Sequence, residues 1–258
     1  MIGAITGDIV GSVYEFDNHR DKRFTLFRDD AFFTDDTVLT VALAETLMHG
    51  GDYGDAMRRW YRHYPQASYG GMFRKWAETT HAGPYYSWGN GSAMRVSPVG
   101  YVFDTLDEVL DQAAASAAHT HDHPEGIKGA QAVAAAILLA RQGADKPAIR
   151  NYCETAFGYD LETSLDVIRA DYDFDVSCQG TVPPAIRAFL EAENFEDAIR
   201  NAISLGGDSD TLACITGSIA EAFYGVPEWI EAEVFHRLDA PLAAVTRAFG
   251  ERYMSAAR

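Results

Sequence analysis

Two short acid-rich runs, each placed where an apolar helix is expected to begin, constrain the fold of this chain more than any other feature. The sequence is TDDT at 34–37 and GGDSDT at 206–211, and helically spaced apolar residues follow both runs. A helix N-terminus needs one capping side chain, so the second acid in each run is surplus. We therefore expect the fold to bring the two helix starts together with their four carboxylates: Asp35, Asp36, Asp208 and Asp210.

These carboxylates and the neighbouring hydroxyls offer oxygen ligands only, a set that suits Mg²⁺, Mn²⁺ or Ca²⁺ rather than Zn²⁺. Two such helix starts could share a two-metal site with about 3.5 to 4 Å between the ions. The helix dipole disfavours a cation at a helix N-terminus, so several anionic ligands are required to hold one there. The alternative interpretation is a pair of ordinarily capped helices that bind no metal.

Composition limits the partners and the compartment. The formal charge of −17 disfavours sequence-independent binding to nucleic acid or to an anionic membrane, since both require a basic surface. Three cysteines without CxxC spacing fit reduced thiols better than a disulfide framework. The sequence shows no membrane-spanning run and no basic signal-peptide start. We expect a soluble, cytoplasmic monomer.

The periodicity predicts an all-α fold: about a dozen short helices in one compact domain, residues 1–258, with the acidic caps gathered at one end. No segment alternates with the period of a strand, and no linker divides the chain. Helices are expected at 1–16, 38–49, 52–64, 69–80, 124–141, 162–172, 183–193 and 195–205, from a cap at Asp104 to about Ala118, from Asp145 onward, after Asp210 as far as Gly225, and over the tail 227–254. Loops are expected at 18–33, 81–91 and 173–182.

Glycines recur four residues apart in the first expected helix: Gly3, Gly7 and Gly11. Each glycine costs about 1 kcal/mol inside a helix, so the stripe predicts that another helix or a ligand lies directly against this face. A polar stripe runs along another side of the same helix: Asp8, Ser12 and Glu15. The residues alone favour a solvent-exposed face for this second stripe.

A glycine and aromatic loop precedes Ser92. Backbone N–H groups at Gly89 and Gly91 could meet a diphosphate and Trp88 could stack on a base, whereas the alternative is a tight turn with a core tryptophan. The alternating histidines at 119, 121 and 123 lack partners for a transition-metal site. Cys178, with no evident base, is expected to be a buried apolar residue.

Five ordered motifs together resemble the ADP-ribosylglycohydrolase family. They are GDIVGSVYE at 7–15, FTDDT at 33–37, SWGNGSAMR at 87–95, THDHPEGIKGA at 120–130 and SLGGDSDT at 204–211, and they span nearly the whole chain. The resemblance implies a compact orthogonal multi-helix domain with a dinuclear Mg²⁺ or Mn²⁺ site at one end. It further implies hydrolysis of the glycosidic bond at C1″ of ADP-ribose in an ADP-ribosylated protein, nucleic acid or small molecule, with release of ADP-ribose.

The same resemblance assigns individual residues. It implies these metal ligands: Thr34, Asp35, Asp36, Asp208, Asp210 and Thr211. It implies that Glu15 is a mobile acidic residue near the metals, and the general acid is left open among Glu15, Asp35, Asp36 and Asp210. The diphosphate and adenosine side would be held by Ser87, Trp88, Gly89, Asn90 and Gly91, and the distal ribose by His121.

Two other functions stay open at this point. One is a non-catalytic ADP-ribose-binding or structural member of the family, which the complete acid clusters disfavour. The other is a dinuclear metal phosphohydrolase, the use that the acidic caps alone would suggest. The sequence does not identify the group to which ADP-ribose is attached.

Overall fold

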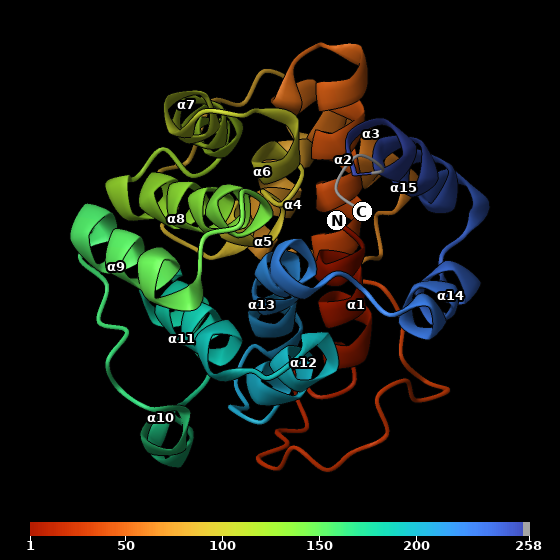
Figure 1. The fold of residues 1–258 in the computed structure, drawn as a ribbon. Coiled ribbons are helices and arrows are strands. Elements are labelled where there is room, and N and C mark those ends of the chain that lie inside the picture. The colour runs from red at the N-terminus through yellow and green to blue at the C-terminus, as the bar shows by residue number, and fades with distance from the viewer. Residues whose placement is uncertain (255–258) are drawn as a thin grey trace.

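Two helices from opposite ends of the sequence form the centre of the molecule: α1 (Ile2–Gly11) and α13 (Ser209–Tyr224) (Figure 1). They lie so close that a Cβ built on Gly3 would be 2.1 Å from the Gly217 carbonyl oxygen. A Cβ on Gly7 would be 2.0 Å from the Ala213 carbonyl oxygen. Only glycine allows two backbones to approach to this distance, so the predicted close contact along the glycine stripe is confirmed.

The remaining helices surround this pair, and the prediction of an all-α fold is confirmed. The computed structural model describes residues 1–254, and within that range Gly89 and Ser177 form an isolated β-bridge but no strand is present. The other helices are α2 (Asp35–His49), α3 (Tyr53–His63), α4 (Gly71–Glu78), α5 (Gly91–Met94), α6 (Val99–Val102), α7 (Leu106–Ala118), α8 (Pro124–Arg141), α9 (Lys146–Phe157), α10 (Leu165–Asp171), α11 (Cys178–Glu191), α12 (Phe195–Ile203), α14 (Glu228–Arg237) and α15 (Ala240–Tyr253). Their apolar side chains pack into one core.

Several helix boundaries follow directly from local sequence signals. α8 begins at Pro124 and ends at Arg141, as predicted, because proline fits the first turn of a helix. The carboxylates of Asp52 and Asp145 accept the backbone N–H groups of Asp55 and Ala148, so both caps are confirmed. The expected loop between residues 18 and 33 contains no helix.

Two predicted boundaries near the site are wrong. The first helix ends at Gly11 and not at residue 16, because the Ser12 hydroxyl donates to the Ile9 carbonyl and accepts the N–H of Phe32, which ties the chain into a turn. α11 begins at Cys178 and not at Pro183: the Ser177 hydroxyl caps it by accepting the N–H of Gly180. The predicted loop 173–182 is therefore helical in its last five residues.

Two further corrections lie away from the site. The cap of α7 is Thr105 and not Asp104, since the Thr105 hydroxyl accepts the Glu108 N–H. The tail forms two helices instead of one. α14 ends at Arg237, and Asp239 caps α15 by accepting the N–H of Leu242.

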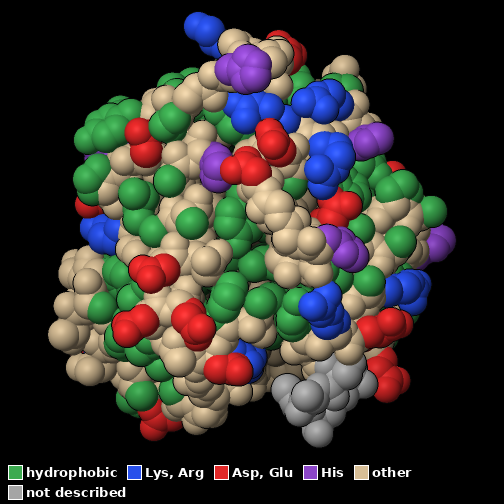
Figure 2. Space-filling model, turned by 90° about the horizontal axis from the view of Figure 1, so that it is seen from above, with side chains coloured by type: hydrophobic (Ala, Val, Ile, Leu, Met, Phe, Trp, Pro, Cys, Tyr) green, Lys and Arg blue, Asp and Glu red, His purple; other side chains and the backbone are tan. Residues whose placement is uncertain are grey.

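Charged side chains of both signs share the surface. In Figure 2, Lys and Arg side chains on the face shown are interspersed with Asp and Glu rather than gathered into one basic patch. Among the helices within residues 1–254, none is long and apolar enough to cross a membrane.

Candidate metal centre and ligand cavity

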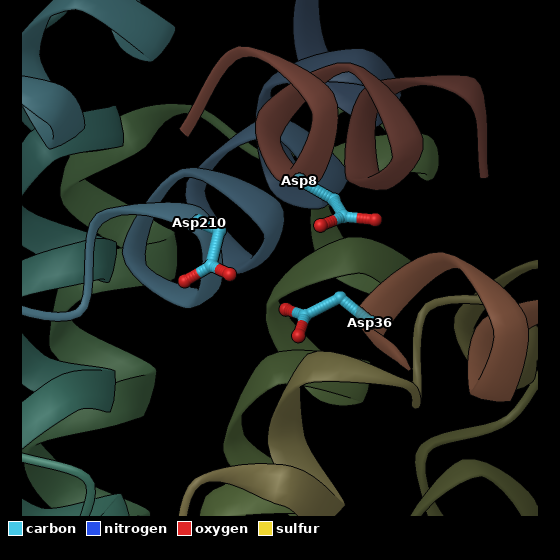
Figure 3. A group of neighbouring side chains, drawn as sticks. All are labelled: Asp8, Asp36 and Asp210. Atoms are coloured by element: carbon cyan, nitrogen blue, oxygen red, sulfur yellow. The ribbon is translucent and has the colours of Figure 1, made fainter. Parts of the chain in front are cut away.

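Three helices bring carboxylates to one point, as Figure 3 shows. Asp8 comes from the middle of α1, Asp36 from the first turn of α2 and Asp210 from the first turn of α13. One oxygen from each lies within 4.8 Å of the others. A second group of three, Glu15, Asp208 and Asp210, meets the same distance criterion. The two groups share Asp210, so the predicted convergence of the two acid-rich helix starts is present in the fold.

Asp8 caps α2 from a different helix. Its carboxylate accepts the N–H groups of Thr34 at 2.9 Å and Thr37 at 3.1 Å, together with both threonine hydroxyls. The side chain is fully buried, so the solvent-exposed polar stripe expected along this helix is wrong at Asp8. Ser12 is buried as well, because its hydroxyl bonds to backbone groups of Ile9 and Phe32. Of the polar stripe, only Glu15 is partly exposed.

Asp36 carries an oxygen that lacks a partner. Its Oδ1 atom is buried and has no hydrogen-bond partner among the described residues, while Oδ2 accepts the Thr211 hydroxyl at 3.5 Å. A buried carboxylate oxygen without a donor is unfavourable unless a cation or a water completes it. Every side-chain atom that the two groups offer as a metal ligand is a carboxylate oxygen, so the residues fit a hard divalent cation.

The carboxylates raise one another's pKa values. Burial is the largest cause, and it raises the pKa of Asp36 and of Asp210 well above the ordinary range, with neighbouring carboxylates adding to the shift. Burial, followed by the charges of Asp208 and Asp8, raises the pKa of Glu15 to about 7. The cluster therefore holds protons more tightly than isolated carboxyl groups do, and a bound cation would compete with those protons.

The other predicted metal ligands occupy different positions around the cluster. Asp35 is half-buried and lines the cavity described below, but it belongs to neither group of three. Thr34 is buried, and its hydroxyl donates to Asp8 at 2.6 Å. Asp208 accepts the side-chain amide of Asn90 at 2.6 Å, and Thr211 contacts Asp36.

A cavity of about 330 Å³ opens beside the acids. Its acidic wall consists of Glu15, Asp35, Asp36, Asp208 and Asp210. The other wall includes Ser87, Gly89, Asn90, Gly91, Arg95 and His121. The apolar part is built chiefly by Leu39, Met72, Phe73, Tyr85, Met94 and Val176. The fold therefore places the predicted loop, the histidine and the carboxylates around one small space, and Asn90 of the loop donates directly to Asp208.

The loop 87–91 is held in place by the segment before α11. The N–H of Asn90 donates to the Val176 carbonyl at 2.8 Å, and the N–H of Cys178 donates to the Trp88 carbonyl at 2.8 Å. Cys178 is fully buried, as predicted, and its thiol donates to the Gly89 carbonyl. The sequence suggested that the Gly89 N–H is free to meet a diphosphate. In the structure it donates to the Ser87 hydroxyl at 3.1 Å.

Trp88 and two of the three alternating histidines lie outside the cavity wall. Trp88 is half-exposed, and its ring centroid is 5.5 Å from that of His123, so it is not a core tryptophan. His123 caps α8 by accepting the Glu125 N–H, while His119 lies 3.6 Å from the Asp52 carboxylate. His121 alone of the three lines the cavity, and none of them belongs to a group of described side chains that could hold a metal.

Sequence reasoning missed two buried residues of the site. Asp8 was visible only as one member of a polar stripe, although its position next to Gly7 on the packed face of α1 was a usable signal. Arg95 ends the motif SWGNGSAMR, but nothing in the sequence indicates that its side chain is fully buried beside the cavity.

Comparisons with known proteins identify the family of the chain. The family model described as ADP-ribosylglycohydrolase matches residues 1–257. ADP-ribosylarginine hydrolase Tri1 of Pseudomonas putida is 30% identical over 275 residues, covering 90% of this chain and 72% of that protein. ADP-ribosylhydrolase ARH3 of Mus musculus is 26% identical over 338 residues, covering 97% of this chain and 91% of its own length.

A solved structure described as an ADP-ribosylglycohydrolase-related protein complex superposes with a TM-score of 0.73 at 26% identity. The match covers 98% of this chain and 97% of the solved one. Sequence and fold thus agree over nearly the full length of the chain. This chain belongs to the ADP-ribosylglycohydrolase family.

Proposed function

We propose that this chain is a metal-dependent hydrolase that cleaves the glycosidic bond at C1″ of ADP-ribose in an ADP-ribosylated substrate and releases ADP-ribose. The observation that carries the proposal is the cavity itself. Five carboxylates that belong to or adjoin the two overlapping groups line it together with residues of the loop 87–91 and His121, in a chain of this family. The relatives named above act on ADP-ribosylated substrates by their names, and one of them on ADP-ribosylarginine.

Two Mg²⁺ or Mn²⁺ ions are the proposed cofactor. The sharing of Asp210 between the two carboxylate groups, and the unpaired Oδ1 of Asp36, support a site for a pair of cations. The proposed ligand set is Thr34, Asp35, Asp36, Asp208, Asp210 and Thr211. When bound, the cations would fix the hydroxyls of the distal ribose and favour ionisation of the attacking water.

Glu15 is proposed to move a proton. It lies in the turn after α1, half-buried, at the junction with the loop that contains residues 18–33. A carboxyl group with a pKa of about 7 populates both protonation states at neutral pH, which suits a general acid or base. The ionised carboxylates beside it would stabilise the positive charge that develops at C1″ as the glycosidic bond breaks.

The loop 87–91 and His121 are proposed to hold the rest of ADP-ribose. Asn90 is fixed by three contacts: its N–H to Val176, and its side-chain amide to Asp208 and Thr181. A loop held this firmly loses little further freedom when a ligand binds. Such a loop would orient the distal ribose so that C1″ faces the carboxylates.

Product analysis with purified protein tests the proposal. The protein would be incubated with arginine-linked and serine-linked ADP-ribose in Mg²⁺, in Mn²⁺ and in EDTA, and the products separated by chromatography. We expect free ADP-ribose with either cation and none in EDTA. AMP or inorganic phosphate in its place would show a phosphohydrolase and overturn the proposal. Absence of turnover on every ADP-ribosylated substrate, despite cation and ADP-ribose binding, would indicate a non-catalytic member of the family.

Two variants add a matched comparison. Asp36→Asn keeps the size of the side chain and removes its charge, so it should lower divalent-cation affinity at least tenfold and abolish turnover, because a hard cation requires anionic oxygen ligands. Asp171→Asn makes the same change at an exposed position of α10 and should leave both unchanged. Calorimetry with Mn²⁺ measures the affinity. Equal cation affinity in the two variants would contradict the assigned role of Asp36.

A further inference from the structure

Arg95 is a fully buried arginine that follows the short helix α5 and lines the cavity. Its Nη2 atom donates to the Thr120 hydroxyl at 2.8 Å and to the Ser116 carbonyl at 3.4 Å. Its Nε and Nη1 atoms have no partner among the described residues. A guanidinium buried in this way is unfavourable for folding, so its placement calls for a reason other than packing.

The hydrogen bonds continue from Arg95 to the cavity through Thr120. The Thr120 hydroxyl lies 2.7 Å from Nδ1 of His121. A guanidinium can only donate, so the hydroxyl oxygen accepts from Arg95. A second lone pair could also accept, but Thr120 is fully buried and its one hydrogen needs an acceptor too. The Tyr85 hydroxyl also faces Thr120, but the Nδ1 atom is the acceptor within hydrogen-bond distance. The Thr120 hydrogen is thereby directed to Nδ1.

A histidine ring whose Nδ1 accepts a hydrogen bond carries its proton on Nε2. The Nε2 atom of His121 faces the loop 87–91: it would lie 3.2 Å from a Cβ built on Gly91 and 3.5 Å from one built on Gly89. Both glycines line the same cavity as His121. The ring therefore presents an N–H donor beside the two glycines that line the cavity.

We infer that Arg95 and Thr120 are positioning residues that fix His121 as the neutral Nε2–H tautomer, so that it donates a hydrogen bond to an acceptor oxygen of the bound ligand. The inference rests on the proposed function for the identity of that ligand, which is ADP-ribose, but not for the tautomer. Burial and the positive charge of Arg95 lower the pKa of His121 well below its ordinary value, which agrees with a neutral ring.

The first test reads the tautomer directly. Nitrogen-15 spectra of the full chain labelled at histidine, with His121 assigned by its loss in His121→Gln, distinguish a protonated Nε2 from a protonated Nδ1. We expect a protonated Nε2 in the parent and in Thr120→Ser, which keeps the hydroxyl. In Thr120→Val, which keeps the size but lacks the hydroxyl, we expect the two tautomers to mix. A protonated Nδ1 in the parent, or an unchanged spectrum in Thr120→Val, would overturn the inference.

The second test reads the consequence for the ligand. Calorimetry with ADP-ribose should show a five- to tenfold weaker affinity in Thr120→Val and near-parental affinity in Thr120→Ser, with Mn²⁺ affinity unchanged in both. A parent that shows the Nε2–H tautomer but fails to bind ADP-ribose would reject the proposed function and leave the tautomer assignment intact. Equal ADP-ribose affinity in all three proteins would reject the positioning role.

Arg95→Lys supplies an independent check from the other end of the chain of hydrogen bonds. Lysine retains the charge and can donate to Thr120 from a slightly shorter, more flexible arm, whereas Arg95→Met removes both the charge and the donors. If Arg95 acts through Thr120, Arg95→Lys should retain more of the Nε2–H tautomer than Arg95→Met. Circular dichroism verifies that each variant is folded before the spectra are compared. The same tautomer in parent and in a folded Arg95→Met would exclude Arg95 from the role.

Discussion

Replacing Gly11 with alanine tests whether the packing of α1 on α13 sets the geometry of the carboxylate site. A Cβ built on Gly11 would lie 2.3 Å from Cα of Asp210 and 2.6 Å from its backbone nitrogen. Ordinary van der Waals contact begins near 3.4 Å, so the two backbones must separate by about 1 Å. The obstructing atoms belong to backbone and not to a flexible side chain. The first turn of α13, with Asp210, must therefore shift away from Asp8.

The magnitude follows from the tolerance of a cation site. Metal–ligand distances are held to within about 0.2 Å, so a displacement of about 1 Å removes Asp210 from effective coordination in either carboxylate group. We expect divalent-cation affinity to fall at least tenfold, which corresponds to about 1.4 kcal/mol. Overpacking also destabilises a fold by about 1 to 3 kcal/mol, and the better helix propensity of alanine offsets up to about 1 kcal/mol of that.

Calorimetry with Mn²⁺ and urea unfolding in EDTA measure the two effects separately. Gly250→Ala is the control: it makes the same change inside α15, where an added Cβ would meet no atom within 4 Å among residues 1–254, its own stretch of helix backbone apart. We expect it to retain parental cation affinity and parental or slightly higher stability. Parental cation affinity in a folded Gly11→Ala would refute the claim that this helix contact fixes the site.

Three further predictions address chemistry, ligand binding and pH. Glu15 belongs to the second carboxylate group but not to the proposed ligand set, so Glu15→Gln should keep cation and ADP-ribose affinity. It should lower kcat on an ADP-ribosylated substrate about a hundredfold, the range for one general acid or base, and a parental kcat would remove Glu15 from the mechanism. Gly89→Val should weaken ADP-ribose binding with little change in Mn²⁺ affinity, because the added side chain would crowd Ser87 and His121, and equal loss of both affinities would point to a folding defect instead. Without divalent cations, the unfolding free energy should fall as pH rises from about 5 to 7.5: the pKa values of the buried acids, Asp210 and Glu15 among them, are raised in the folded state, so over this range the unfolded chain binds fewer protons. Thermal unfolding should show Mg²⁺ stabilising the protein more at pH 7.5 than at pH 5.5, and an Mg²⁺ effect independent of pH would contradict this reasoning.

Local signals in the sequence were sufficient wherever a helix boundary depends on its own residues. Pro124 and the alanine-rich run after it determine α8, and Asp145 caps α9. The signal failed at α11, where Pro183 resembles a helix start but lies inside the helix. Cys178 begins that helix because its side chain is buried against the loop 87–91, a contact between segments almost ninety residues apart in the chain. Propensity cannot report such a contact.

The candidate site was likewise only partly predictable from the sequence. The meeting of the two acid-rich helix starts was predictable, because each run carried more acid than a cap requires. Arg95 was not predictable, because its burial depends on the distant Thr120. Asp8 offered only its place beside Gly7, because its burial depends on Thr34 and Thr37. An isolated charged residue in a helix is usually exposed, and only the packing of α1 on α13 and α2 reverses that expectation here.

Asp8 shows how the proposed site could hold a cation at helix N-termini. The N-terminal amides of α2 carry partial positive charge and would repel a cation or occupy the nearest carboxylate. Asp8, from another helix, accepts the N–H groups of Thr34 and Thr37, so it satisfies those amides and adds a negative charge next to them. Asp36 is then left with its Oδ1 atom unpaired among the described residues, and its carboxylate lies next to those of Asp8 and Asp210 (Figure 3). The start of α2 would ordinarily favour an anion. Because Asp8 of α1 supplies the cap, Asp36 of α2 stays available and this helix start can favour a cation instead.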